Sequence, residues 1–205
     1  MSDERLCREE RTRRRDELLE QGLSQHPLRE SARESGQFRF KFCPRDGTPL
    51  VMKRIDGRDR PTCPIDGFAE FMFVQIGANT IVERDGGVLL VRLNYGPRDG
   101  HWALPGGLVE NDETFEEAAR RETTEETGFE VGLDGLLATW MRPGFPILVV
   151  IYRAHITSGT LRVAPDEASE AAFFPKDKLP PLEDLAWPST AHGLDAWRAY
   201  EPPRP

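Results

Sequence analysis

Three glutamates in one short stretch, Glu122, Glu125 and Glu126, have the residue type and the spacing for metal chemistry. If the stretch is a helix, positions three and four apart are neighbours, so these carboxylates converge on one patch. The patch is costly, because like charges at this spacing each lose roughly 0.2–0.5 kcal/mol and the last turns of a helix favour cations. Oxygen ligands gathered at one point suit Mg²⁺ or Mn²⁺, which would remove both penalties. The alternative is a solvated acidic face, the ordinary role of a charge run.

The helix that must carry these acids has clear start and stop signals. Thr114 followed three residues later by Glu117 is a capping-box pattern, and Gly128 suits the left-handed residue that ends a helix. The apolar side chains on the same stripe as Glu122 and Glu126, which we expect to face a core, are Phe115, Ala118 and Ala119.

The spacing around the acids is specific. Gly107 is followed after five residues by Glu113, and after seven more by the run Arg121–Phe129. This pattern resembles the signature of the Nudix hydrolase family, and eight of its nine specified positions match if Phe129 is accepted as apolar. Thr123 stands where the family has an aliphatic residue, which concerns the packing of the helix underside rather than metal binding. The preceding run from Trp102 to Gly106 also resembles the family's usual approach to this segment.

The resemblance assigns roles to individual residues. The metal ligands that it implies for Mg²⁺ or Mn²⁺ are Glu122, Glu125, Glu126 and the Gly107 carbonyl. Glu126 or a later glutamate is the expected general base. Arg121 and Glu113 are expected to pair, because the planar guanidinium suits a carboxylate bidentately, and the pair would lock the loop onto the helix.

The implied reaction is hydrolysis of the pyrophosphate in a nucleoside diphosphate linked to another moiety, such as ADP-ribose, a nucleotide sugar or a dinucleotide. A pyrophosphate repels hydroxide, and a divalent ion neutralises its charge and lowers the pKa of bound water. The alternative from a different class is a non-catalytic Nudix module that binds a nucleotide and signals. The intact set of acids favours the enzyme.

Outside this segment the candidates are weaker. The candidates for stacking on a base are Trp102, Trp140 and Phe145, and the candidates for clamping a phosphate are Arg92, Arg98 and Arg142. Core packing is at least as good an explanation for each aromatic. Glu167 and Glu170 precede a predicted strand and are candidates for a further ligand or base, although surface-loop carboxylates are the favoured interpretation.

A second motif precedes the first. Cys43-Pro-Arg-Asp-Gly recurs as Cys63-Pro-Ile-Asp-Gly and resembles the two knuckles of a zinc ribbon, which some Nudix hydrolases carry just before the catalytic domain. Asp46 and Asp66 stand where the second cysteine of each pair belongs, and structural zinc sites are overwhelmingly built from Cys and His. We therefore favour a ribbon fold that survives without metal over a Zn²⁺ site at these four residues.

Composition limits the remaining options. The chain has 205 residues and a net charge of −8, and residues 107–129 alone carry eight acids against two bases. This acidity argues against a nucleic-acid partner, and no apolar run is long enough to span a membrane. Three cysteines do not make a disulfide framework, so we expect a cytoplasmic protein. The expected partner is a small-molecule substrate, and a homodimer is an option.

The expected organisation is a charged, partly helical extension over residues 1–36, a ribbon-like module over 37–69 and a Nudix domain over 70–205. The segments predicted as strands are 71–76, 80–82, 88–91, 136–141, 147–152 and 171–174, and Pro188–Tyr200 is predicted as a closing helix with Leu194 and Trp197 facing inward. Strands around one central and one terminal helix suggest an α/β/α sandwich with a mixed sheet, which is the Nudix fold.

Overall fold

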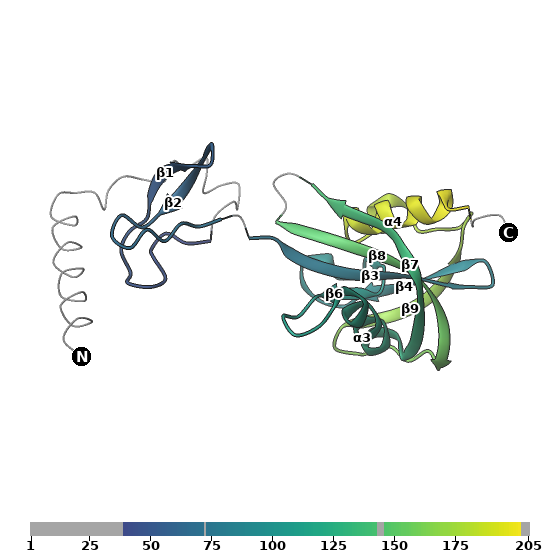
Figure 1. Ribbon diagram of the computed structural model, residues 1–205. Coiled ribbons are helices and arrows are strands. Elements are labelled where there is room, and N and C mark those ends of the chain that lie inside the picture. Colours follow the sequence, from purple (N-terminus) through teal and green to yellow (C-terminus); the bar gives the residue numbers. More distant parts are fainter. Residues whose placement is uncertain (1–38, 72, 143–145, 202–205) are drawn as a thin grey trace. The chain divides into compact units, whose positions relative to one another are not determined.

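The computed structural model describes residues 39–71, 73–142 and 146–201 (Figure 1). The chain divides into two compact units. The ribbon unit takes in the described residues up to Phe73 together with Pro146, and the sheet unit takes in Val74–Arg142 and residues 147–201. The partly helical extension expected over residues 1–36 lies outside the described residues.

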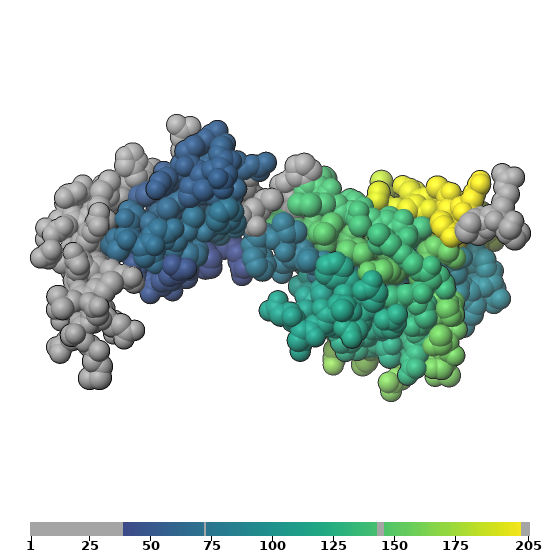
Figure 2. All heavy atoms as spheres, in the orientation of Figure 1, coloured from purple at the N-terminus to yellow at the C-terminus, as the bar shows by residue number. Residues whose placement is uncertain are grey.

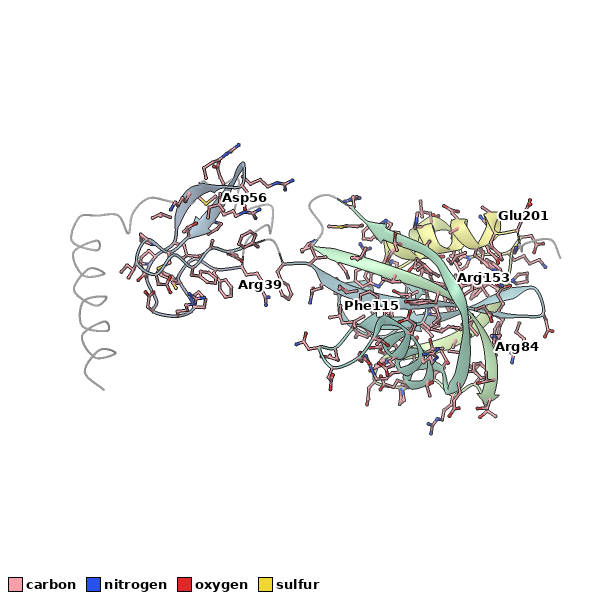
Figure 3. The ribbon with its side chains drawn as sticks, viewed as in Figure 1. Arg39, Asp56, Arg84, Phe115, Arg153 and Glu201 are labelled. Atoms are coloured by element: carbon pink, nitrogen blue, oxygen red, sulfur yellow. The ribbon has the colours of Figure 1, made fainter. Side chains whose placement is uncertain are left out.

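The ribbon unit contains one hairpin and two knuckles. Strands β1 (Val51–Ile55) and β2 (Arg58–Thr62) pair antiparallel. Asp56 and Gly57 join them with φ angles of 50° and 73°, as a tight two-residue hairpin turn requires, and Asp56 is labelled at the tip in Figure 3.

The two knuckles have the same local geometry. In the first, the Gly47 N–H donates to the Cys43 carbonyl at 2.9 Å, and in the second the Gly67 N–H donates to the Cys63 carbonyl at 3.2 Å. The sequence repeat is therefore a structural repeat. The small core of the unit is formed by Cys43, Leu50 and Cys63, with Ile65 and Phe68 packed against them.

The sheet unit is built on seven strands. Their bounds are β3 (Gln75–Arg84), β4 (Gly87–Leu93), β5 (Trp102–Ala103), β6 (Gly106–Leu108), β7 (Phe129–Met141), β8 (Ile147–Gly159) and β9 (Ala168–Pro175). The main order is β5-β4-β3-β8-β7, while β6 pairs with β3 and β9 pairs with β4. β3 and β8 run parallel and the other pairs are antiparallel, so the sheet is mixed, as predicted.

Two helices cover opposite faces of this sheet, α3 (Phe115–Thr127) on one and α4 (Pro188–Ala199) on the other (Figure 1). Ala78 on β3 packs on the α3 face, whereas Ile81 packs in the core under α4 with Leu194 and Trp197. The helix predicted from Pro188 and its two inward residues are confirmed, and Figure 2 shows α4 in yellow at the surface of the unit. No helix in the described ranges is long and apolar enough to cross a membrane.

The connecting elements are short. The 3-10 turns are η2 (Gly96–Arg98) and η3 (Leu182–Asp184). Two predicted strand segments, 71–76 and 80–82, are wrong in their bounds, because Gln75–Arg84 is one continuous strand and its pairing with β8 and β6 spans the polar residues between them. Strand β8 continues through Ser158 and Gly159, and both residues pair with β7.

Candidate active site

Helix α3 begins and ends where its sequence predicts. The Thr114 hydroxyl accepts from the Glu117 N–H at 3.2 Å, and the Glu117 carboxylate accepts from the Thr114 N–H at 2.8 Å, which closes the capping box. At the other end Gly128 has a φ of 72°, and its N–H donates to the Thr124 carbonyl at 2.8 Å. Both termini are therefore fixed by local hydrogen bonds.

The buried face of α3 differs from the prediction at its first turn. Ala118 and Ala119 are fully buried against the sheet, but Phe115 is 38% exposed (Figure 3). Glu116 is also exposed, and its carboxylate accepts a hydrogen bond from the Tyr152 hydroxyl on β8 at 2.9 Å. The apolar stripe therefore starts one turn later than the spacing indicates.

Glu126 is the most buried acid of the helix, with 4% of its surface exposed. Its carboxylate accepts a hydrogen bond from the Gly106 N–H at 2.9 Å, which ties the last turn of α3 to the start of β6. Burial, together with the negative charges of Glu122 and Glu167, raises the pKa of Glu126 to about 8, although the hydrogen bond from Gly106 favours the charged form.

Glu122 lies directly over the backbone of Gly107. A Cβ added at Gly107 would lie 2.5 Å from each carboxylate oxygen of Glu122, so a side chain at that position would displace the acid. Burial raises the pKa of Glu122 as well. Glu125 is more exposed than either neighbour. The three acids thus form a patch that is buried at one side and open at the other.

Arg121 connects this patch to the preceding loop. Its guanidinium donates to both carboxylate oxygens of Glu113, at 2.6 and 3.0 Å, and to the Leu108 carbonyl at 3.2 Å. It also contacts Glu122 at 2.8 Å and Glu125 at 3.0 Å. The hydrogen bonds from Arg121 lower the pKa of Glu113 to about 2, so this pair stays charged and holds the loop against the helix.

Two residues from distant loops approach the patch. The charge of Glu167, just before β9, raises the pKa of Glu122 and Glu126. Tyr95 follows β4, and its raised pKa reflects partial burial and then the charges of Glu126, Glu167 and Glu122. The loops themselves are joined, because the Asn94 N–H donates to the Glu167 carbonyl at 3.3 Å. Glu167 was a sequence candidate, whereas Tyr95 was not, and no local spacing marks it.

The other sequence candidates have different surroundings. Trp102 packs edge-to-face on Phe174 at 4.8 Å, in the core under α4, and Trp140 packs in the same core. Arg92 contacts Glu170 at 3.6 Å and donates to the Gly100 carbonyl at 2.9 Å. The remaining candidates are placed as follows: Arg98 lies 5.6 Å from the centre of the Trp187 ring, Arg142 follows β7 and is exposed, and Phe145 lies outside the described residues.

The four ribbon residues come together. One donor atom from each of Cys43, Asp46, Cys63 and Asp66 lies within 4.8 Å of the others. Burial raises the pKa of Cys63 to about 11. The pKa of Asp66 is lowered although burial opposes this, because the Phe68 N–H, the Cys63 thiol and Arg45 favour its charged form.

The acids of α3 suit a divalent cation. They offer oxygen atoms only, Glu126 is buried and Glu122 is partly buried, each with a raised pKa, and the Glu122 carboxylate lies against the backbone of Gly107. These are the donors that Mg²⁺ and Mn²⁺ prefer, and a cation would remove the repulsion among the carboxylates.

Comparison with known proteins identifies relatives of the sheet unit. The family model described as NUDIX domain matches residues 74–195. An ADP-ribose pyrophosphatase of Methanocaldococcus jannaschii is 34% identical over 116 residues, which are 55% of this chain and 68% of that protein. A NAD-capped RNA hydrolase NudC of Chromobacterium violaceum is 29% identical over 194 residues, 91% of this chain and 71% of the relative.

Solved structures agree in fold. A NUDIX hydrolase from Nitrosomonas europaea superimposes with a TM-score of 0.68 and 26% identity, covering 78% of this chain and 90% of that one. Several further sequence relatives are matched over only 50–65% of their own length.

Proposed function

The chain belongs to the Nudix hydrolase family, and from this premise we propose that it is a metal-dependent hydrolase that cleaves the pyrophosphate of a nucleoside diphosphate linked to another moiety. The observation that carries the proposal is a pair of carboxylates beside β6: Glu126 is buried and accepts a hydrogen bond from the Gly106 N–H, and Glu122 is partly buried against the backbone of Gly107. Two acids with raised pKa values in one patch are a costly arrangement that a structural helix does not need.

We assign the metal ligands to Glu122, Glu125 and Glu126, with the Gly107 carbonyl as a further ligand. When bound there, Mg²⁺ or Mn²⁺ neutralises pyrophosphate charge and lowers the pKa of a water molecule. The family generally uses divalent metals such as Mg²⁺, which is consistent with this donor set.

Each remaining residue of the patch has a task that follows from its contacts. Glu126, besides being a metal ligand, is the first candidate to accept the proton of the attacking water, because a general base must lie within hydrogen-bond reach of that water. Glu167 is the second candidate for this role. Arg121 and Glu113 position the loop, since Arg121 also holds the Leu108 carbonyl next to Gly107.

For the substrate, ADP-ribose is the first choice. A relative named ADP-ribose pyrophosphatase is 34% identical, and another named NAD-capped RNA hydrolase aligns over 91% of the chain. The two names share an adenosine diphosphate group joined to a second ribose. Arg92, Arg98, Arg142 and Trp102 remain our candidates for substrate contacts.

A screen of substrates tests the proposal. We would incubate the chain with ADP-ribose, NADH, nucleotide sugars and nucleoside triphosphates, each with Mg²⁺ or Mn²⁺, and follow product formation. The proposal expects turnover of at least one diphosphate-linked compound, dependent on the metal and lost in Glu126→Gln. Tight binding of a compound without turnover of any would favour the alternative, a nucleotide-binding sensor.

The cysteines bear on the cellular compartment that we propose for this chain. Cys43 and Cys63 are free and buried, which suits a reducing cytoplasm. A homodimer remains a prediction, and light scattering of the full chain would test it.

A further inference from the structure

The ribbon unit holds a second cluster of ligating groups, independent of the acids on α3. Cys43 Sγ lies 3.8 Å from both carboxylate oxygens of Asp66, and Cys63 Sγ lies 3.9 Å from Asp46 Oδ2. Each thiol therefore faces the aspartate of the other knuckle. The cluster crosses the internal repeat and joins its two copies.

These separations match the edges of a coordination tetrahedron. With Zn–S near 2.3 Å and Zn–O near 2.0–2.2 Å, sulfur and oxygen ligands of one zinc ion lie about 3.5–3.7 Å apart. A thiol is only a weak donor, so contacts of 3.8–3.9 Å are long for hydrogen bonds. We propose that Cys43, Asp46, Cys63 and Asp66 bind one tetrahedral divalent transition metal, for which Zn²⁺ is the best match. This revises the metal-free ribbon that the sequence favours.

The aspartates are oriented by the backbone for this role. Asp46 Oδ1 accepts from the Thr48 N–H at 2.9 Å, and Asp66 Oδ1 accepts from the Phe68 N–H at 2.8 Å. Asp46 is thus fixed through one oxygen, while its Oδ2 faces Cys63. Hydrogen bonds from outside the cluster that fix a ligand's orientation are a regular feature of metal sites.

The charge of the four ligands and the softness of the two thiolates decide which metal ion fits the site. Two thiolates and two carboxylates would carry four negative charges around the ion, and Arg45 lies 3.5 Å from Asp66 to offset part of the excess. Thiolates favour Zn²⁺ over Mg²⁺ and Ca²⁺, which take oxygen ligands only. The site is therefore chemically distinct from the oxygen-only patch on α3.

The size of the described ribbon supports a metal as well. Its two strands have five residues each, and its core has three buried side chains, two of them the ligating cysteines. Modules this small usually need a metal or a disulfide to hold their fold, because they bury too little apolar surface. Both cysteines of the described ribbon are free, so a metal is the kind of cross-link that these two residues can still supply.

Cobalt substitution of the reduced full chain tests the proposal. Co²⁺ bound by thiolates in a tetrahedron gives a sulfur-to-metal charge-transfer band and intense visible bands, and Zn²⁺ should displace it at one equivalent per chain. We expect Asp46→Asn and Asp66→Asn to weaken binding by at least about tenfold, because asparagine can keep the bond to the backbone N–H but loses the charged ligand.

Two controls separate this site from the rest of the chain. The variant Glu122→Gln/Glu126→Gln should keep the thiolate band unchanged, since the α3 patch has no sulfur. The variant Asp46→Cys/Asp66→Cys should bind cobalt at least as tightly and gain charge-transfer intensity, which also checks that the ribbon still folds. A wild-type chain without a thiolate band, beside an Asp46→Cys/Asp66→Cys variant that shows one, would overturn the proposal.

Discussion

The two units of this protein each gather groups that repel one another, but they place them on cores of very different size. In the sheet unit, Glu122 and Glu126 lie over a seven-stranded sheet covered by two helices. In the ribbon unit, Asp46 and Asp66 lie beside a core of three buried side chains. The large core can carry the cost of acids that repel one another, so its site can serve chemistry. The small core cannot, so its site should serve the fold.

The largest effect expected is on activity in the sheet unit. Glu126→Gln should lower kcat by about 10²–10⁴-fold, because it removes both a metal ligand and the candidate base while glutamine still accepts from the Gly106 N–H. Steady-state hydrolysis of ADP-ribose with Mg²⁺ measures this. Glu125→Gln should also abolish turnover. Full activity in both variants would show that the acids of α3 are not the active site.

Glu126→Gln should raise the stability of the fold at alkaline pH although it lowers the activity. Glu126 has a folded pKa of about 8 against an ordinary value of 4.5, so between these pH values the folded chain holds a proton that the unfolded chain has released. The free energy of unfolding therefore falls as pH rises through this window, by at most about 5 kcal/mol. Thermal melts without divalent ions should find Glu126→Gln more stable than the parent at about pH 9 and nearly equal to it at about pH 5.

Gly107→Ala should separate activity from stability. The new Cβ would displace the Glu122 carboxylate, which is the flexible end of a side chain, so the fold should change little while kcat/KM falls about 10–100-fold. The matched control is Gly77→Ala on the neighbouring strand, where the nearest atom would lie at an ordinary 3.5 Å. Equal activity losses in the two variants would contradict the placement of Glu122.

The smallest effect concerns the departure from the family pattern. Thr123 is fully buried, and its hydroxyl lies 2.7 Å from that of Thr80 on β3. Thr123→Val should cost about 1–3 kcal/mol by leaving the Thr80 hydroxyl unpaired, and Thr80→Val/Thr123→Val should recover most of it. Chemical denaturation of the single and double variants measures the cycle. Additive losses would show that the two hydroxyls do not form a pair.

Local signals in the sequence predicted the elements that local hydrogen bonds define. The start and end of α3 follow from Thr114, Glu117 and Gly128, because the caps use neighbouring residues. Phe115 was misjudged, since helical spacing cannot say that Glu116 meets the Tyr152 hydroxyl on β8. Strand β3 was divided in the prediction because its polar residues gain their partners from β6 and β8, far along the chain.

The same limit applies to the sites. The three glutamates of α3 and the cysteine repeat are visible as spacing, because each lies within one motif. Tyr95 and Glu167 reach the patch from two loops that lie more than sixty residues apart in sequence. A hydrogen bond from the Asn94 N–H to the Glu167 carbonyl joins these loops, so the approach of both residues depends on strand order. The match of the ribbon donors to a tetrahedron depends on distances between two knuckles, which composition cannot supply.

Calorimetric titration of the full chain with Mn²⁺ is the most direct test of the central claim that the acids of α3 hold a divalent cation. Wild type should take up the ion at this patch, and Glu122→Gln/Glu126→Gln should lose that uptake while its circular dichroism spectrum stays native. Equal uptake by both proteins, or none by either, would contradict the account.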